Sequence, residues 1–549
     1  MTTRDFVIIG GGINALVAAA NLAESGRDVQ VLERNDQVGG ALQSTEILGE
    51  GIEADLYATN LNLFLANPGY EKWKDKLRKL GFEPAHTTKP YCNVFPDGKA
   101  IKVYGDIEKT RAGLREHSPE DLRGFDELYS EYKIFNKSMF PLYSAPMPTA
   151  ETVSLLTSGI TKVGFNKFME VAQIVLSSTR ELGEQYFHTK EMKAVISTWG
   201  LHMDYGPEVS AGAMFPFMET FADMENGMTL AKGGAQNLIK ALVALIKEFG
   251  GVVTTDAEVV EILTEGQKAT GVKLANGEVI EAREAVIAGT GPNALYNELL
   301  GKSSAIDHNV RSKAARYQYG PATMMVHLAL DAPAPWTAGE EIQDFQYVHI
   351  VPYVDDMSRT YTQAIQGILP DSPTLIVGQP TATDPTRAPE GTHVLWVQVR
   401  CLPFEPTSDS KGEITPGSWD DMKEAYADRV VDKLEEYAPG LKEHIIARDV
   451  RSPLDLQRHN PNLVNGDSVG GSHHIRQMFL FRPWLGGSTY KTPVNDLYLI
   501  GAATWPGGGL NGLSGWHLSE HLLGDSLQDR ISDKVVTGVN RVREFVRRW

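Results

Sequence analysis

Closely spaced glycines follow the first apolar run of the chain. Residues 6–9 (FVII) form a short apolar run, which is typical of a strand buried on both faces of a parallel sheet. Gly10, Gly12 and Ala15 then match G-x-G-x-x-G/A, where small residues permit a tight turn and a close approach of backbone to a pyrophosphate. A helix expected over 14–25, which begins with Asn14, would point its N–H groups at the phosphates. The spacing predicts a dinucleotide-binding site, and the alternative is an ordinary βαβ unit.

An acid and a second pair of glycines come next. Glu33 ends the second predicted strand about twenty residues after the glycines, where a carboxylate binds ribose hydroxyls, and Arg34 follows it. Gly39, Gly40 and Ala41 lie directly behind this acid. A second loop could therefore lie along the same pyrophosphate.

Residues 490–515 (YKTPVNDLYLIGAATWPGGGLNGLSG) carry the most specific pattern. A buried strand over 497–500 leads into Gly501 and Ala502, and the glycine-rich turn that follows feeds a helix starting near Gly512. The cofactor contacts expected in this turn are Gly508, Gly509 and Leu510. A helix N-terminus aimed at a flavin pyrimidine would stabilise the negative charge that develops on reduction. The alternative is a flexible loop.

These motifs together resemble the flavoprotein family that includes phytoene desaturases, amine oxidases and the Rab GDP-dissociation inhibitors. The resemblance implies FAD, because NAD enzymes generally lack the second glycine pair, and it matches Val259 to a valine that lies against the adenine. Many relatives place an acid at the position of Ala502, so this alanine favours the phytoene-desaturase-like branch. Residues 466–484 also resemble that branch, especially members related to pyridine nucleotide-disulfide oxidoreductase domain-containing protein 2, although the cysteine pair suggested by that name is absent.

Composition narrows the class of protein. A formal charge of −18 argues against nucleic-acid binding. Cys92 and Cys401 form no C-x-x-C, so a disulfide reductase is excluded and a reducing, cytoplasmic location is expected. No stretch reaches eighteen apolar residues, and the early first strand leaves no room for a signal peptide. Peripheral membrane contact stays open, as do the oligomeric state and the electron acceptor.

The predicted fold class is α/β. A Rossmann-type FAD-binding domain, like that of glutathione reductase and amine oxidases, carries an inserted substrate domain of mixed sheet and helices. The FAD-binding domain is expected over residues 1–66, 227–300 and 487–549, the last with C-terminal helices. The substrate domain is expected over residues 67–226, a helical and charged cap, and 301–486.

Individual elements are predicted from periodicity and turns. Ser118 caps a helix, and a second helix covers 236–248. The predicted strands are 252–255, 258–264, 269–274, 278–282, 285–288, 324–330 and 393–401, and a helix follows at 419–437. Most Phe and Met residues of 151–225 are expected in the core, with a few lining the substrate cavity. Asp55 is expected at a surface or turn.

Flavin chemistry needs a substrate C–H near N5, exclusion of water and a destination for a proton. The candidates for a base are His473, His474 and His517, with Trp505 as an aromatic wall. Any of them could equally be structural, and adjacent histidines on a strand point to opposite faces, so no metal site is predicted.

The predicted function is FAD-dependent removal of hydride from a mainly apolar, isoprenoid- or carotenoid-like small molecule. Reoxidation would be by oxygen, a quinone or another acceptor. One alternative is an oxidase that acts on a C–N or C–OH centre of a smaller molecule, and another is redox-neutral isomerisation on reduced flavin. A third is a non-catalytic isoprenoid-binding protein of the GDP-dissociation-inhibitor type.

Overall fold

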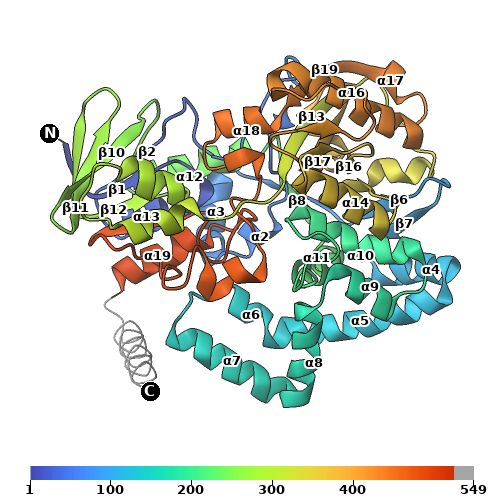
Figure 1. Cartoon of the computed structure of the whole chain (residues 1–549), viewed down its shortest axis with the longest axis horizontal. Helices are drawn as coiled ribbons and strands as arrows, with labels where there is room; N and C mark the ends of the chain where they lie inside the picture. Colours follow the sequence, from blue (N-terminus) through green and yellow to red (C-terminus); the bar gives the residue numbers. More distant parts are fainter. Residues whose placement is uncertain (1, 525–549) are drawn as a thin grey trace.

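The computed structural model describes residues 2–524, which fold around two large sheets that lie side by side (Figure 1). The C-terminal helices expected beyond residue 524 lie outside the described residues. No helix within residues 2–524 is long and apolar enough to cross a membrane.

The first sheet contains the glycine motifs. Five parallel strands lie in the order β20, β12, β1, β2, β9, and the antiparallel ribbon β10–β11 extends it from β12. Its strands are β1 (Thr2–Ile9), β2 (Val29–Leu32), β9 (Val252–Thr254), β10 (Val259–Glu265), β11 (Lys268–Leu274), β12 (Val279–Ala288) and β20 (Leu497–Leu499). The two strands predicted over 278–288 are one continuous strand, β12, because its two halves pair with different neighbours, β11 and β20. The parallel order confirms the α/β prediction.

Both faces of this sheet are buried. Phe6 and Ile8 of β1 pack against a layer of helices, whereas Val7 and Ile9 face the core beneath the β10–β11 ribbon. The helical layer consists of α1 (Ile13–Glu24), α3 (Pro68–Lys79), α12 (Gln236–Glu248) and α19 (Leu513–Leu523). Alanines at 15, 18 and 19 bring α1 close to its neighbours, and α1 contacts both α12 and α19. The apolar alternation of one short strand thus organises the domain.

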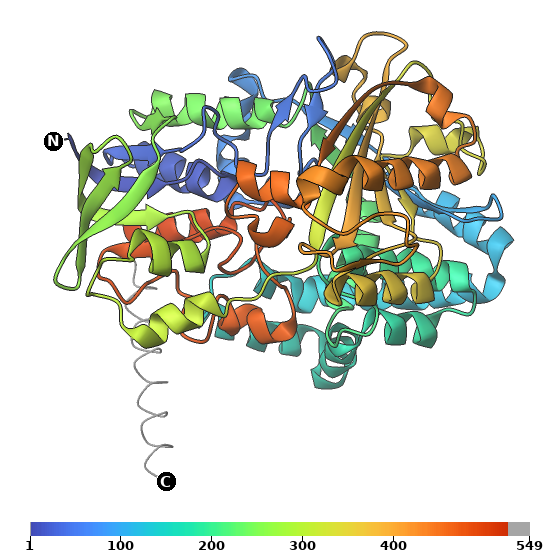
Figure 2. The same cartoon turned by 45° about the horizontal axis from the view of Figure 1, so that its top comes forward.

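The second sheet is mostly antiparallel and has seven strands in the order β19, β13, β17, β16, β14, β6, β7. Its strands are β6 (Tyr91–Val94), β7 (Ala100–Val103), β13 (Ala322–Leu330), β14 (Tyr347–Ile350), β16 (Thr374–Gly378), β17 (His393–Leu402) and β19 (Ile445–Arg451). Helix α16 (Trp419–Tyr437) covers one face, as Figure 2 shows. The other face turns Tyr347, Trp396 and Met325 toward the helical part of the chain.

The expectation of helix throughout 67–226 is wrong for residues 84–103. This segment forms β5 (Pro84–Thr87), β6 and β7, and β6 lies parallel to β14. Every residue of β6 is buried, although Tyr91 and its partner Tyr347 are far apart in the sequence. Pairing with so distant a strand overrides local propensity, and periodicity in a short window does not register it.

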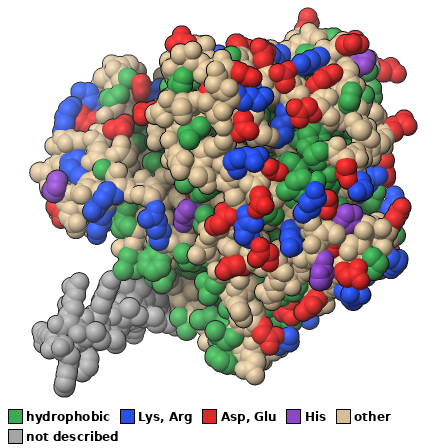
Figure 3. Space-filling model, turned by 45° about the vertical axis from the view of Figure 1, so that its right-hand side comes forward, with side chains coloured by type: hydrophobic (Ala, Val, Ile, Leu, Met, Phe, Trp, Pro, Cys, Tyr) green, Lys and Arg blue, Asp and Glu red, His purple; other side chains and the backbone are tan. Residues whose placement is uncertain are grey.

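Helices occupy most of the remainder of residues 107–226. They are α4 (Ile107–His117), α5 (Pro119–Ser138), α6 (Phe140–Tyr143), α7 (Ala150–Val163), α8 (Phe165–Leu176), α9 (Thr179–Tyr186), α10 (Lys190–His202) and α11 (Met214–Asn226). Helices α7 and α8 project from the body of the molecule (Figure 1). Figure 3 shows apolar side chains scattered among charged ones on the face it presents.

Short elements connect these layers. The strands are β3 (Ser44–Thr45), β4 (Ala54–Asp55), β8 (Met228–Ala231), β15 (Ile368–Leu369) and β18 (Ser408–Asp409). The helices are α2 (Asn62–Leu65), α13 (His308–Ala315), α14 (Val354–Ile365), α15 (Pro380–Thr383), α17 (Leu441–His444) and α18 (Pro453–His459), with a π-helical turn at Ala294–Leu299.

Asp55 is buried, which corrects the expectation of a surface or turn position. Its Oδ2 lies 2.8 Å from Nη1 of Arg387, and both side chains are almost fully buried. Asp55 also accepts hydrogen bonds from the Ala235 N–H and the Thr59 hydroxyl. The carboxylate therefore links the loop after the glycine motifs to α12 and to the second sheet.

Candidate functional site

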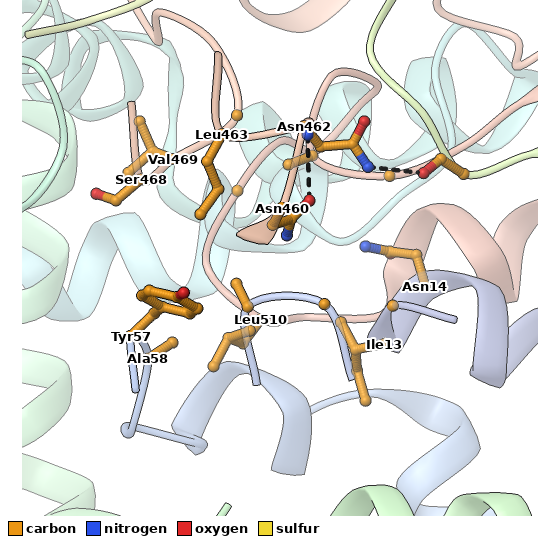
Figure 4. Close-up of a pocket in the computed structure, with 18 of the residues that line it drawn as sticks. Ile13, Asn14, Tyr57, Ala58, Asn460, Asn462, Leu463, Ser468, Val469 and Leu510 are labelled. Atoms are coloured by element: carbon orange, nitrogen blue, oxygen red, sulfur yellow. Dashed lines mark hydrogen bonds between the residues drawn. The ribbon is translucent and has the colours of Figure 1, made fainter. Parts of the chain in front are cut away.

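One cavity of about 440 Å³ joins the two halves of the molecule. Its wall is made at one end by the glycine loops of the first sheet and at the other by aromatic side chains of the second sheet and the helices. Figure 4 shows Ile13, Asn14 and Leu510 on the glycine-loop side, across from Asn460 and Asn462. A long ligand could therefore contact both domains at once.

The first glycine loop fits a bound pyrophosphate. Gly12 is the N-cap of α1 and has no side chain that could satisfy the first N–H groups of the helix. A Cβ added at Gly12 would meet no atom within 4 Å, because the space beside it belongs to the cavity. Gly10 has a φ of +88°, which L side chains rarely adopt. An anion can thus approach the helix N-terminus directly.

The second glycine pair lies against the first. Gly39 pairs with Gly12 as an isolated parallel bridge, and the Gly39 N–H donates to the Gly11 carbonyl at 2.9 Å. A Cβ at Gly40 would lie only 3.2 Å from the Gly12 Cα. Gly40 also has a φ of +62°. The two loops therefore need glycine at this close approach, in the arrangement predicted for a shared pyrophosphate.

Glu33 is held by backbone donors at the other side of the loop. Its Oε2 accepts from the Gly11 N–H at 2.7 Å and its Oε1 from the Asn35 N–H at 3.0 Å. Arg34 lies beside it, 3.8 Å from Glu258, and Val259 begins β10 on the same stretch of cavity wall. These positions suit the ribose and adenine of a dinucleotide.

The last motif is joined to the first by side-chain hydrogen bonds. Ser514 accepts from the Gly501 N–H and donates to Asn14 Oδ1, both at 2.9 Å. A Cβ at Gly515 would lie 1.8 Å from the Asn14 carbonyl oxygen, so α19 and α1 pack in direct backbone contact. Two helix N-termini thus meet beside the cavity.

The structure places every predicted cofactor contact on the cavity wall except Gly512. Those on the wall are Gly10, Gly12, Asn14, Ala15, Glu33, Arg34, Gly39, Gly40, Ala41, Val259, Gly501, Ala502, Gly508, Gly509 and Leu510. Gly512 instead forms the N-cap of α19, with a φ of +67°.

His473 lies behind the glycine-rich turn. Its side chain is buried, and its Nε2 accepts from the Gly508 N–H at 3.1 Å. Burial and the neighbouring Arg482 guanidinium hold the pKa of His473 well below its usual range. The neutral ring therefore supports the turn that lines the cavity, without forming part of the wall.

His474 and His517 lie away from the cavity wall. His474 follows His473 in a loop, not in a strand, and its Nε2 contacts the Asp204 carbonyl at 3.0 Å. His517 shares a hydrogen bond with the Tyr490 hydroxyl through Nδ1 at 3.1 Å. Burial lowers the pKa of His517 to about 4. Trp505 is also off the wall and donates to the Ala145 carbonyl.

Sequence reasoning missed the loop of residues 459–463. Asn462 accepts from the Gly291 N–H at 2.9 Å and donates to the Gly289 carbonyl at 3.0 Å, so this loop is fixed to the end of β12. Asn460 faces the glycine loops across the cavity (Figure 4). Its asparagines follow no recognisable spacing, and only the tertiary fold brings them to the site.

Sequence reasoning also missed the polar groups of the aromatic end. Trp199, Phe215, Tyr347 and Trp396 line it, with the Tyr347 and Trp396 rings stacked at 5.8 Å. Among them lie Glu219 of α11 and His202 of α10. Of the Phe and Met residues singled out in 151–225, Met203 and Phe215 line the cavity, as expected for a few of them.

Similarity to known proteins identifies the family. The model of the flavin containing amine oxidoreductase family matches residues 16–511, so the chain belongs to this family. Among its relatives are phytoene-desaturase-like proteins, which agrees with the branch that Ala502 favours. FAD is therefore the cofactor, and the glycine loops have the geometry to hold it.

Individual relatives cover nearly the whole chain. A limonene dehydrogenase component from Castellaniella defragrans is 27% identical over 92% of this chain and 91% of its own length. Pyridine nucleotide-disulfide oxidoreductase domain-containing protein 2 of Rattus norvegicus is 26% identical over 93% and 92%. The 4,4'-diapophytoene desaturase of Staphylococcus haemolyticus is 24% identical over 92% and 95%.

The fold is shared with solved structures. An oxidoreductase from Methanosarcina mazei superposes with a TM-score of 0.59 at 16% identity, covering 95% of this chain and all of that one. Among residues 2–524, no cluster of three or more His, Cys, Asp or Glu side chains could hold a metal ion.

Proposed function

We propose that this flavoprotein removes hydride from a mainly apolar, isoprenoid- or carotenoid-like small molecule and forms a C=C bond. The observation that carries the proposal is the continuity of the cavity from the dinucleotide-binding loops to the aromatic compartment. A substrate in that compartment would lie next to the flavin end of the cofactor. Bound FAD would supply a two-electron acceptor, with N5 as the hydride acceptor.

The chain itself orients the substrate and excludes water. Apolar and aromatic side chains hold a hydrocarbon by contact area and shape, since it offers few hydrogen bonds. The walls formed by Met203, Phe215, Met325, Tyr347 and Trp396 meet this requirement. Positioning of the reacting carbon against the cofactor would then account for much of the rate.

The relatives support an apolar substrate. They include a limonene dehydrogenase component and a 4,4'-diapophytoene desaturase, whose names describe a hydrocarbon substrate in each case. We infer the same class of substrate here, with reoxidation by oxygen, a quinone or another acceptor. We expect the protein in the cytoplasm, where peripheral contact with a membrane would give access to such substrates.

Product analysis tests this proposal. Purified protein with added FAD and a soluble quinone is incubated separately with limonene, 4,4'-diapophytoene and cyclohexylamine, and the products are identified by mass spectrometry. The proposal predicts a hydrocarbon product with two fewer hydrogen atoms and no turnover of the amine. Turnover of cyclohexylamine alone would contradict it and assign the site to C–N oxidation.

A further inference from the structure

Removal of hydride is only half of a desaturation. When hydride leaves one carbon, a proton must leave its neighbour, and a hydrocarbon has no acidic group of its own to assist. A proton acceptor inside the cavity is therefore required. The question is which side chain on the cavity wall can take that proton.

Glu219 is a carboxyl without a protein partner at the aromatic end of the cavity. It is 7% exposed and lies on the cavity wall. No hydrogen bond or ion pair joins its carboxyl oxygens to any side chain or backbone group among residues 2–524. A buried carboxyl is normally hydrogen-bonded, because burial without a partner costs free energy. One that faces a ligand cavity is available to a ligand.

Asp223 lies one helical turn after Glu219 on α11. Its side chain is fully buried, and its Oδ1 accepts from Asn62 Nδ2 at 2.9 Å while Oδ2 has no partner. Burial and the nearby Glu219 raise the pKa of Asp223 well above its usual range. Asp223 is thus neutral at physiological pH, and any negative charge on the pair resides on Glu219.

We infer that Glu219 is the proton acceptor of the reaction. This inference rests on the proposed function. The C–H bond next to the carbon that loses hydride breaks, and its electron pair becomes the second bond of the alkene. Its proton passes to a Glu219 carboxylate oxygen, while the hydride, with its own electron pair, passes to FAD as the oxidant.

The acid–base properties of Glu219 suit this role. Burial raises its pKa to about 7, so the carboxylate is present near neutral pH and is more basic than an exposed one. The other titratable groups near it are Asp223, His202 and the phenols of Tyr91, Tyr132, Tyr143 and Tyr347. Burial raises the pKa of each phenol above its usual value, so all four stay neutral.

His202 is a weaker candidate. Its Nε2 already shares a hydrogen bond with His349 Nε2 at 3.0 Å, and His349 in turn contacts Asn93 through Nδ1. Burial and the neighbouring His349 hold the pKa of His202 well below its usual range, and burial lowers that of His349 to about 3. A ring that resists protonation and already has a partner is a poor proton acceptor.

The test compares Glu219→Gln with Glu225→Gln, an exposed glutamate on the same helix that bonds the Tyr129 hydroxyl. Two readouts are used on FAD-loaded protein. The first is infrared difference titration of the resting enzyme, in which the wild type and Glu225→Gln should show a carboxylic acid band that ionises near pH 7 and Glu219→Gln should lack it. The second is anaerobic flavin reduction by limonene and 4,4'-diapophytoene.

We expect Glu219→Gln to retain FAD and to lose at least about a hundredfold in the rate of flavin reduction, as removal of a general base does. Asp223→Asn, which keeps a neutral group, should change this rate much less. A Glu219→Gln enzyme that reduces flavin at the wild-type rate would overturn the inference and leave the proposed function standing. Wild-type flavin reduced by neither hydrocarbon would overturn both.

Discussion

Ser514 donates a hydrogen bond of 2.9 Å to Asn14, although 500 positions separate them in the chain. The same hydroxyl accepts from the Gly501 N–H, so one serine joins the first and last cofactor motifs. The two helix N-termini are fixed to each other before any ligand binds. This preorganisation reduces what binding must spend on ordering.

Ser514→Ala should weaken FAD binding. Loss of the hydroxyl leaves the Gly501 N–H and Asn14 Oδ1 without this partner, at a cost of about 1–2 kcal/mol, or roughly tenfold in Kd. Fluorescence titration of apoprotein with FAD measures this change. Ser130→Ala, at a serine that bonds only within α5, is the control and should leave the Kd unchanged. An unchanged Kd in Ser514→Ala would show that the link does not contribute.

Gly12→Ala should fold normally and bind FAD poorly. The backbone at Gly12 has a φ of −74°, which any residue adopts, and its Cβ would meet no protein atom. The added methyl group would instead occupy the space of the pyrophosphate. Thermal unfolding of the apoprotein should match the wild type, whereas equilibrium dialysis should show loss of at least about a hundredfold in affinity, or about 2.7 kcal/mol.

Gly113→Ala is the matched control, because Gly113 is an exposed glycine in α4 whose Cβ would also meet no atom. It should keep full FAD affinity and gain about 0.5–1 kcal/mol in the free energy of unfolding. Full affinity in Gly12→Ala would contradict the placement of the pyrophosphate beside α1.

The motifs could be read from the sequence because their chemistry is local. Gly10, Gly12 and Gly40 are required by backbone geometry within a few residues, and Val259 begins a ribbon announced by its turns. Glu219 and Asn462 carry no such mark. Each is an ordinary residue of a helix or loop until the fold brings it to the cavity, and the same is true of the buried pair of Asp55 and Arg387.

His473→Phe should affect FAD binding and leave the pH dependence of flavin reduction unchanged. The variant removes the acceptor of the Gly508 N–H, which should weaken FAD binding by about 1–2 kcal/mol. Because its pKa lies well below the usual range, His473 is neutral throughout pH 6–8 and does not titrate there. Stopped-flow rates across that range measure the profile. Disappearance of a pH-dependent step in this variant would instead make His473 the base.

Arg387→Met should destabilise the fold strongly. Arg387 is completely buried between Asp55 at 2.8 Å and Asp384 at 3.4 Å, so its loss leaves two buried carboxylates without their cation. The expected cost is about 3–5 kcal/mol in the free energy of unfolding. Urea denaturation followed by tryptophan fluorescence measures it.

Arg458→Met removes an arginine from an exposed pair with Asp420 and serves as the control, with an expected cost below about 1 kcal/mol. Equal effects of the two substitutions would show that the buried pair stabilises the fold no more than a surface pair.

The visible absorbance spectrum of the purified protein under anaerobic conditions tests the central claim most directly. The account predicts bound oxidised flavin that bleaches when limonene or 4,4'-diapophytoene is added and that keeps its spectrum with cyclohexylamine. A protein that binds no flavin after incubation with FAD, or whose flavin is bleached only by the amine, would contradict it.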